Sequence, residues 1–244
     1  MHALTAAEML DVWESGQGRD APGRALLVLT AATGASATDL AHLSIARRDA
    51  LLFDARRLAF GDELRAVVAC PACAETLEFT TNVGAFTPDE PTSAEAVTIE
   101  AGALRATVRP PTTADLLAVR DAASVAAARD RLLARCVDAL ERDGHPVAFD
   151  LLDAAEVSAL AAAASEAPAL SDVLLELTCV ACGSSWQSTF DVAAYLWEEV
   201  CAFASRLLPE VHVIAHAYGW SEREILGLSP ARRARYLELI ETGA

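Results

Sequence analysis

Two matching pairs of cysteines constrain what this chain of 244 residues can fold into more than any other feature. Cys70-Pro-Ala-Cys73 and Cys179-Val-Ala-Cys182 are both C-x2-C motifs. A C-x2-C turn directs two thiolates towards one point, and two such turns supply the four sulfur ligands of a tetrahedral Zn²⁺ site. The sequence therefore predicts that these four cysteines meet in one structural zinc site.

Each cysteine pair begins a repeated unit. Residues 70–83 read CPACAETLEFTTNV and residues 179–192 read CVACGSSWQSTFDV, so both cysteines, the alanine between them, a strand threonine and a final valine recur in register. Strand-like runs follow the pairs at 76–81 and 186–190, and we expect these strands to pair beneath the metal. Zinc ribbons usually have about 15–20 residues between their cysteine pairs. Here residues 74–178 intervene, so the predicted ribbon is split by an insertion.

Two other uses of a C-x2-C pair are disfavoured by context. Structural disulfides are typical of secreted proteins, and the opening residues 1–5 do not resemble a signal peptide. A redox pair normally precedes a helix, whereas both pairs here precede strands. Four thiolates leave no open position on a tetrahedral ion, so the predicted zinc stabilises the fold and does not activate water.

Composition and charge exclude several classes of partner. The chain has 19 basic residues, all of them arginine, against 35 acidic residues, which gives a formal net charge of −16. Nucleic acids and anionic membranes attract basic surfaces, so we expect neither as a partner. The 53% of hydrophobic residues is enough for a folded core. No uninterrupted apolar run is long enough to span a membrane, and we expect the protein to be cytoplasmic.

Hydrophobic periodicity predicts an α+β fold that is mostly helical, with the split four-cysteine zinc ribbon and a small β-hairpin. The hairpin is expected at 97–100 and 104–109, after a loop at 84–96. Helices are expected across 4–66, at 113–121, 124–141 and 153–165, from Asp191 to about Leu208, from Pro209 to Tyr218, and at 231–241.

These elements divide the chain into five predicted parts. They are an N-terminal helical segment (1–66), the first zinc knuckle with β-hairpins (67–110), a helical insertion (111–171), the second zinc knuckle (172–192) and C-terminal helices (193–244).

No catalytic constellation is evident, and we expect a non-enzymatic protein without a small-molecule substrate. His212 and His216 have the i, i+4 spacing of metal ligands, but Val213 stands where a zinc protease has its general-base glutamate. Packing or interface histidines are therefore the favoured interpretation. The sequence contains no dinucleotide-binding glycine motif, phosphate-binding loop or nucleophile elbow.

Aromatic and arginine side chains near the C-terminus indicate a protein-binding surface, because such residues commonly anchor interfaces. An amphipathic N-terminal helix that includes a tryptophan is a second candidate. The candidate partner-binding residues are Trp13, Tyr218, Trp220, Arg232, Arg233 and Tyr236.

Several of these motifs together resemble a known family. Residues 212–238 are similar to the tail signature of baseplate proteins from contractile-tailed phages and phage-tail-like contractile injection systems. The opening residues 4–14 and the two C-x2-C motifs resemble the baseplate hub assembly chaperones of those systems. The segment Arg109-Pro-Pro-Thr-Thr-Ala-Asp-Leu116 is similar to a strand-to-helix motif of tail assembly proteins.

The resemblance implies a non-enzymatic role in assembling the baseplate, with hub, spike or tube proteins as partners. The protein would act as a transient chaperone or as a component retained in the assembled particle. Two alternatives remain: a zinc-dependent enzyme that uses His212 and His216, and a regulatory zinc-ribbon module that binds nucleic acid.

Overall fold

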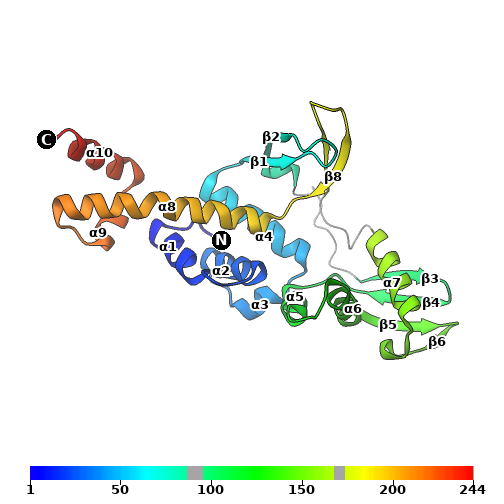
Figure 1. The fold of residues 1–244 in the computed structure, drawn as a ribbon. Helices are drawn as coiled ribbons and strands as arrows, with labels where there is room; N and C mark the ends of the chain where they lie inside the picture. The colour runs from blue at the N-terminus through cyan, green and yellow to red at the C-terminus, as the bar shows by residue number, and fades with distance from the viewer. Residues whose placement is uncertain (87–95, 168–173, 244) are drawn as a thin grey trace.

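The computed structural model describes residues 1–86, 96–167 and 174–243. It has the predicted fold class, mostly helical with small antiparallel sheets (Figure 1). The helices are α1 (Ala6–Ser15), α2 (Ala21–Thr33), α3 (Ala37–Ala41), α4 (Ile45–Phe60), α5 (Thr113–Val119), α6 (Val125–Cys136), α7 (Ala154–Glu166), α8 (Val192–Tyr218), α9 (Glu222–Leu226) and α10 (Pro230–Glu241), with short 3-10 turns at Val83–Ala85 and Phe149–Leu151. The strands are β1 (Glu63–Ala69), β2 (Thr76–Asn82), β3 (Val97–Ala101), β4 (Leu104–Val108), β5 (Val137–Arg142), β6 (His145–Pro146), β7 (Leu174–Thr178) and β8 (Ser185–Thr189).

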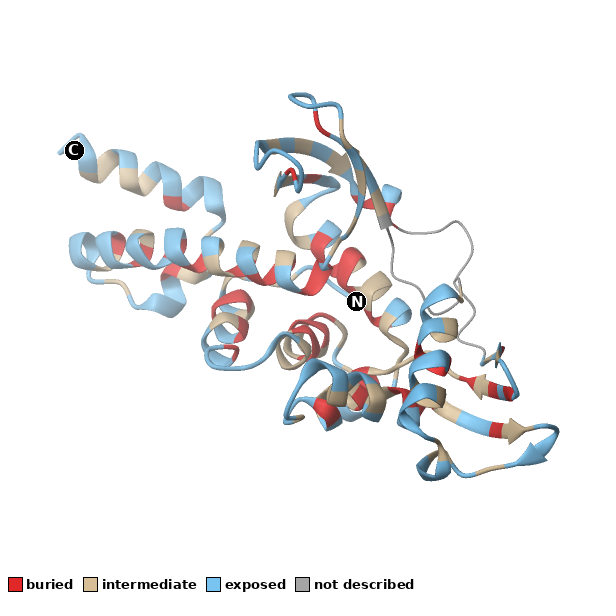
Figure 2. Cartoon of the chain, turned by 45° about the vertical axis from the view of Figure 1, so that its right-hand side comes forward, coloured by how far each residue is buried: buried red, intermediate tan, exposed pale blue. Residues whose placement is uncertain are grey.

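Helix α8 is the axis on which α1, α2, α4, α9 and α10 pack (Figure 1). A continuous buried stripe explains this role: Leu196, Val200, Ala204, Leu207 and Val211 recur every three or four residues on one side. The first half of α8 shares a core with α1, α2 and α4, and the second half packs against α9 and α10. Figure 2 shows buried residues along α8 and the helices beside it.

The prediction of a new helix at Pro209 was wrong. Pro209 lies inside α8, which continues to Tyr218. Proline removes one helical hydrogen bond, but Leu207, Val211 and Ile214 keep their faces buried on both sides of it. This packing outweighs the local loss, and the helix ends instead at Gly219, whose φ of 69° forms a left-handed cap.

A second body consists of the sheet β3-β4-β5-β6 and the helices α6 and α7. The predicted hairpin is present as β3 and β4. The predicted helix over 124–141 was wrong beyond Cys136, because residues 137–142 form β5 and pair with β4. Leu140 of that strand joins Ile99 and Leu160 in the core of this body. The inserted segment is therefore a small body of antiparallel strands and helices and is not helical throughout.

Some of the predicted segment boundaries differ from the observed ones or cannot be compared with them. Strand β1 begins at Glu63, within the predicted N-terminal helical segment. Most of the loop predicted at 84–96 lies outside the described residues, as does part of the boundary between 111–171 and 172–192. No helix in the described part of the chain is long and apolar enough to cross a membrane.

Asp115 joins the inserted body to the N-terminal helices. It lies in the first turn of α5, which packs against α2 and α3, and it is 1% exposed. Arg109 at the end of β4 donates to both of its carboxylate oxygens (2.7 and 3.1 Å), and Arg135 in α6 donates to one of them (3.0 Å). The Thr112 N–H and hydroxyl also donate to the Asp115 carboxylate (3.0 and 2.8 Å), which forms part of a capping box at the start of α5. Residues 109–116, which resemble a tail-assembly motif, therefore link β4, α5 and α6 through charged hydrogen bonds.

Asp115→Asn should lower the free energy of unfolding by about 3 kcal/mol at pH 7, because it leaves the arginines without their carboxylate. Asp138→Asn is the control, since Asp138 is exposed and lies 4.0 Å from Arg109; it should change stability by less than about 0.5 kcal/mol. Urea unfolding measures both. Equal losses for the two variants would contradict the structural role of Asp115.

The same interaction predicts a pH dependence. Burial raises the pKa of Asp115, but hydrogen bonds from Arg109 and Thr112 outweigh it and lower the pKa well below its ordinary value. A carboxyl whose pKa is lowered by folding stabilises the protein above its unfolded pKa, and this stability is lost as the pH falls towards the folded pKa. In urea unfolding at a series of pH values, the stability advantage of wild type over Asp115→Asn should begin to shrink below about pH 4 and continue to fall as the pH is lowered further.

Candidate metal centre

Each C-x2-C motif forms the tip of a β-hairpin. Strands β1 and β2 pair from Glu63↔Asn82 to Ala69↔Thr76, and β7 and β8 pair from Leu174↔Thr189 to Thr178↔Ser185. The expectation that strands of the two units pair with each other was wrong. The two hairpins are separate two-stranded sheets, and each motif has a strand before it as well as after it.

The two tips have the same backbone hydrogen bonds. In the first, the Cys70 N–H donates to the Glu75 carbonyl and the Ala74 N–H donates to the Cys70 carbonyl, both at 2.8 Å. The second tip repeats both bonds at 2.9 Å, through Cys179, Gly183 and Ser184. The sequence repeat is thus a repeat of local structure, and it aims both cysteine pairs in the same way.

The four cysteine sulfurs form one cluster, as the sequence predicts, with all Sγ atoms within 4.8 Å of one another. The distance is 3.7 Å for Cys70 to Cys182 and also for Cys73 to Cys179. A tetrahedral thiolate site with metal–sulfur bonds of about 2.3 Å has sulfur–sulfur edges of about 3.8 Å. The cluster therefore has the donor set and the spacing to bind a metal ion.

The electrostatics of the cluster also favour a cation. Hydrogen bonds from the Ser184 side chain and N–H lower the pKa of Cys182 to about 6. For Cys73, the Glu75 N–H lowers the pKa, but burial and the neighbouring thiols outweigh it and raise the pKa to about 12. A thiolate therefore forms first at Cys182, and further negative charge in the cluster is disfavoured unless a cation balances it.

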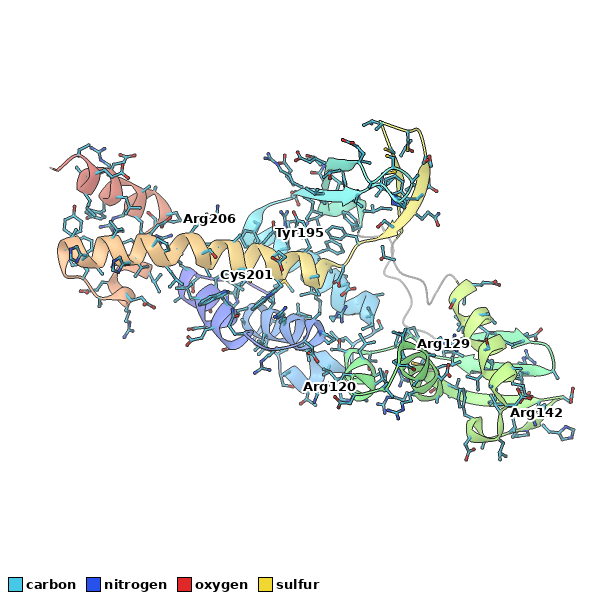
Figure 3. The ribbon with its side chains drawn as sticks, in the orientation of Figure 1. Arg120, Arg129, Arg142, Tyr195, Cys201 and Arg206 are labelled. Carbon is cyan, nitrogen blue, oxygen red and sulfur yellow. The ribbon has the colours of Figure 1, made fainter. Side chains whose placement is uncertain are left out.

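Aromatic contacts fix the base of the hairpins on α8. Tyr195 lies at the start of α8 beside the first hairpin (Figure 3). Its hydroxyl donates to the Arg65 carbonyl (2.9 Å) and accepts from the Arg65 N–H (3.2 Å) in β1. Phe190, just after β8, packs against Phe86 and Tyr195, with ring centroids 4.6 and 5.2 Å away. Both hairpins therefore share one cluster of aromatic side chains at their base.

A family model described as T4 bacteriophage base plate protein matches residues 26–190. The chain belongs to this family. The match includes both hairpins and the inserted body, and membership implies contacts with other phage baseplate proteins. The C-terminal segment that carries part of the resemblance in the sequence lies outside the matched residues. No curated protein and no solved structure matches the chain.

Within the described residues of this baseplate protein, no third side chain joins the histidine pair to form a metal site. His212 and His216 are exposed on α8, with ring centroids 6.4 Å apart. Among residues 1–86, 96–167 and 174–243, the cysteine cluster is the one group of three or more side chains placed to hold a metal. Two exposed imidazoles do not make the three-ligand site of a zinc enzyme.

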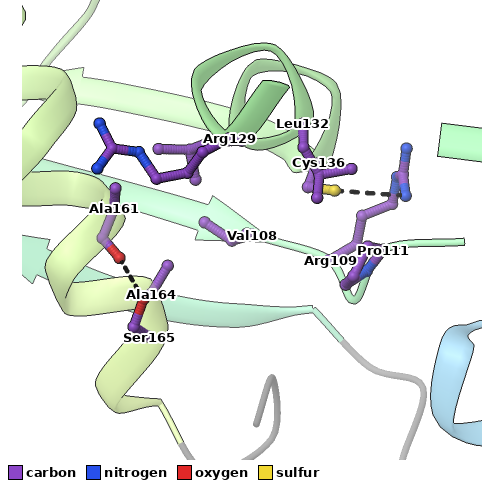
Figure 4. Close-up of a pocket in the computed structure, with 10 residues that line it drawn as sticks. Val108, Arg109, Pro111, Arg129, Leu132, Cys136, Ala161, Ala164 and Ser165 are labelled. Atoms are coloured by element: carbon purple, nitrogen blue, oxygen red, sulfur yellow. Dashed lines mark hydrogen bonds between the residues drawn. The ribbon is translucent and has the colours of Figure 1, made fainter. Parts of the chain in front are cut away.

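A hollow of about 170 Å³ opens between α6, α7 and β4 (Figure 4). Cys136 and Arg109 lie at one end of it, with 3.9 Å between the Arg109 guanidinium and the Cys136 sulfur. Burial raises the pKa of Cys136 to about 11, so the thiol is protonated at neutral pH and a weak nucleophile. The Arg109 guanidinium is engaged by Asp115. Both groups fit structural roles.

The aromatic candidates at the C-terminus contact one another. Tyr218, Trp220 and Tyr236 have ring centroids 4.9 to 5.4 Å apart and tie α10 to the end of α8. Tyr218 is 38% exposed and is the most accessible to a partner of the residues in this aromatic cluster. Trp13 is half-buried and packs between the two halves of the helical core.

The two arginine candidates occupy different environments. Arg232 is exposed on α10. Arg233 is 3% exposed, donates to Glu210 of α8 (3.2 Å) and to the Leu228 carbonyl (2.8 Å), and so holds α10 in place. Sequence spacing alone does not separate these neighbours, because which of them faces α8 depends on how α10 docks.

Cys73→Ser should reduce the metal content from about one ion per chain to near zero and lower the melting temperature, because metal binding is coupled to folding. Cys201→Ser is the matched control, since Cys201 lies on α8 outside the cluster (Figure 3). Elemental analysis and thermal unfolding, with and without a chelator, measure the effect. A Cys73→Ser protein that keeps its metal and melts like wild type would overturn the site.

The hairpin tips give a second, paired prediction. Ala74 and Gly183 occupy the same position of the repeat with φ of 60° and 74°, a region that costs an alanine about 1 kcal/mol relative to glycine. Ala74→Gly should therefore stabilise the metal-bound protein by up to about 1 kcal/mol, and Gly183→Ala should destabilise it by about as much. Urea unfolding tests both.

A Cβ added at Gly183 meets nothing within 4 Å, so its cost comes from the backbone alone. Gly84→Ala is the control, because Gly84 has equal space and no left-handed φ. If Ala74→Gly and Gly183→Ala changed the free energy of unfolding in the same direction, the structural repeat would be contradicted.

Proposed function

We propose that this protein is a non-enzymatic assembly factor or component of the baseplate hub, in a phage tail or a related contractile injection system. It acts by binding other proteins, with hub, spike or tube proteins as its partners. The single observation that carries this proposal is the family match over residues 26–190, which includes the cysteine hairpins and the inserted body.

The proposed ion of the cysteine cluster is Zn²⁺. Four thiolates in tetrahedral spacing suit zinc, which has no redox chemistry of its own in such a site. Zinc would be held by Cys70, Cys73, Cys179 and Cys182, and these four ligands leave no position for water or substrate. Its contribution would be to lock the two hairpins together.

A binding role agrees with the chemistry of the other candidate groups. The paired histidines are two ligands short of a closed tetrahedral site, and the Cys136 thiol is protonated at neutral pH. The net charge of −16 disfavours nucleic acid as a partner and favours proteins with basic surfaces. We place this activity in the cytoplasm, with the protein present in the particle only if it is a retained component.

The test is to capture the tagged full-length protein from its native host and to analyse partners and metal in the same sample. We expect tail spike, tube or baseplate proteins together with about one zinc per chain. Capture without tail proteins would contradict the assembly role. Two metal ions per chain, the second lost in His212→Ala, would favour the enzyme hypothesis instead.

The fate of the protein separates the two forms of the proposal. A retained component should be present in purified particles at a fixed ratio to the hub proteins. A transient chaperone should bind these proteins in lysates and be absent from the particles.

The C-terminal surface can be tested in the same experiment. Arg232→Glu should weaken capture of the partner, whereas Arg223→Glu, an equal charge change at an exposed position of α9, should not. Equal capture by both variants would exclude Arg232 from the interface.

A further inference from the structure

A groove separates the two cysteine hairpins. It has a volume of about 360 Å³ and is lined by Val68 and residues 75–79 of the first hairpin and by Leu177, Thr178, Val180 and Ala181 of the second. Successive side chains of a strand point to opposite faces. A groove lined by consecutive residues of β2 therefore follows the edge of that strand as well as one of its faces.

The strand edges beside this groove have no strand partner. β2 pairs only with β1, and β7 pairs only with β8, within the part of the chain that the structure describes. Each therefore has a second row of backbone N–H and C=O groups that no strand pairs. Such an edge is a template for another strand, and adding a peptide strand to it is a common mode of protein recognition.

The side chains around the groove are apolar and acidic. Leu77, Phe79 and Leu177 are only half-buried, and Val180 at the tip is 91% exposed. Figure 2 shows the hairpins exposed or intermediate along most of their length. An apolar surface of this kind favours an occupant with apolar side chains.

The charge beside the groove is negative and unbalanced. The carboxylates of Glu75 and Glu78 line it, Glu176 is adjacent in β7, and the lining has no basic residue. None of these three carboxylates makes an ion pair with a described residue. Complementary charge speeds association and selects the partner, so the occupant should contain arginine or lysine.

We propose that the groove between β2 and β7 binds an extended segment of a partner protein, with interspersed apolar and basic residues, which adds as a strand along β2 or β7. This inference deepens the proposed function and rests on it, because it names the surface and the kind of segment through which a baseplate partner would be bound.

The test uses photo-crosslinking of the full-length protein in its native host. Benzoylphenylalanine replaces Val180 in one variant and Val125 in another. The two valines are matched, at 91% and 89% exposed, but Val125 lies on α6, outside the groove. We expect position 180 to crosslink to a segment of a baseplate protein with apolar and basic residues, and position 125 to give no such product.

A synthetic peptide with the crosslinked sequence then tests strand addition. Alternate N-methylation along one edge of the peptide should weaken its binding at least about tenfold, because it removes the hydrogen bonds of an added strand. Glu78→Arg should weaken binding of the unmethylated peptide by roughly tenfold. Asp11→Arg, an exposed position with the same charge change on α1, should leave it unchanged.

Several results would overturn the inference. These are a crosslink from position 180 to a second copy of this chain or to an acidic segment, equal products from positions 180 and 125, and equal binding of the methylated peptide. Absence of a product at position 180 while capture still recovers baseplate partners would also overturn it, and would leave the proposed function intact. Loss of all baseplate partners in the capture experiment would instead refute the proposed function.

Discussion

The contact between the four cysteine sulfurs is the interaction on which the placement of the two β-hairpins depends. Isolated two-stranded hairpins are marginally stable in water, and here neither hairpin extends a larger sheet. Their facing side chains are half-buried, so apolar packing alone holds them weakly. A metal shared by Cys70, Cys73, Cys179 and Cys182 would supply the missing stabilisation, because its binding energy becomes folding energy.

This joining also organises the sequence between the hairpins. The inserted body leaves the first hairpin and returns at the second, so the cluster closes a long loop. The Asp115 network provides a second attachment, between the inserted body and the N-terminal helices. The cluster therefore joins the two ends of the inserted segment, and the Asp115 network holds its body against the N-terminal helices.

The sequence predicts the four-cysteine cluster better than it predicts the strands that carry the cysteines. The spacing of Cys70 and Cys73, and its repeat at Cys179 and Cys182, indicates the ligand set because few other arrangements of four thiols satisfy metal geometry. Strand β1 has no such signature: Glu63–Ala69 follows a long helix, and its one buried residue, Leu64, is covered by the helical core. Helix α6 is overextended in the prediction for a similar reason, since residues 137–142 become a strand through pairing with β4. Pro209 and Arg233 depend on how α8 and α10 pack, which one sequence does not specify.

The unbroken length of α8 fixes the distance between the groups that lie at its two ends. Only two residues separate the helix from β8, and it ends at Tyr218, so its 27 residues span roughly 40 Å at 1.5 Å per residue. The cysteine hairpins stand near one end and the Tyr218, Trp220 and Tyr236 cluster stands at the other. Proteins bound at both places would be held at a fixed separation, and the helix would serve as a molecular ruler between them.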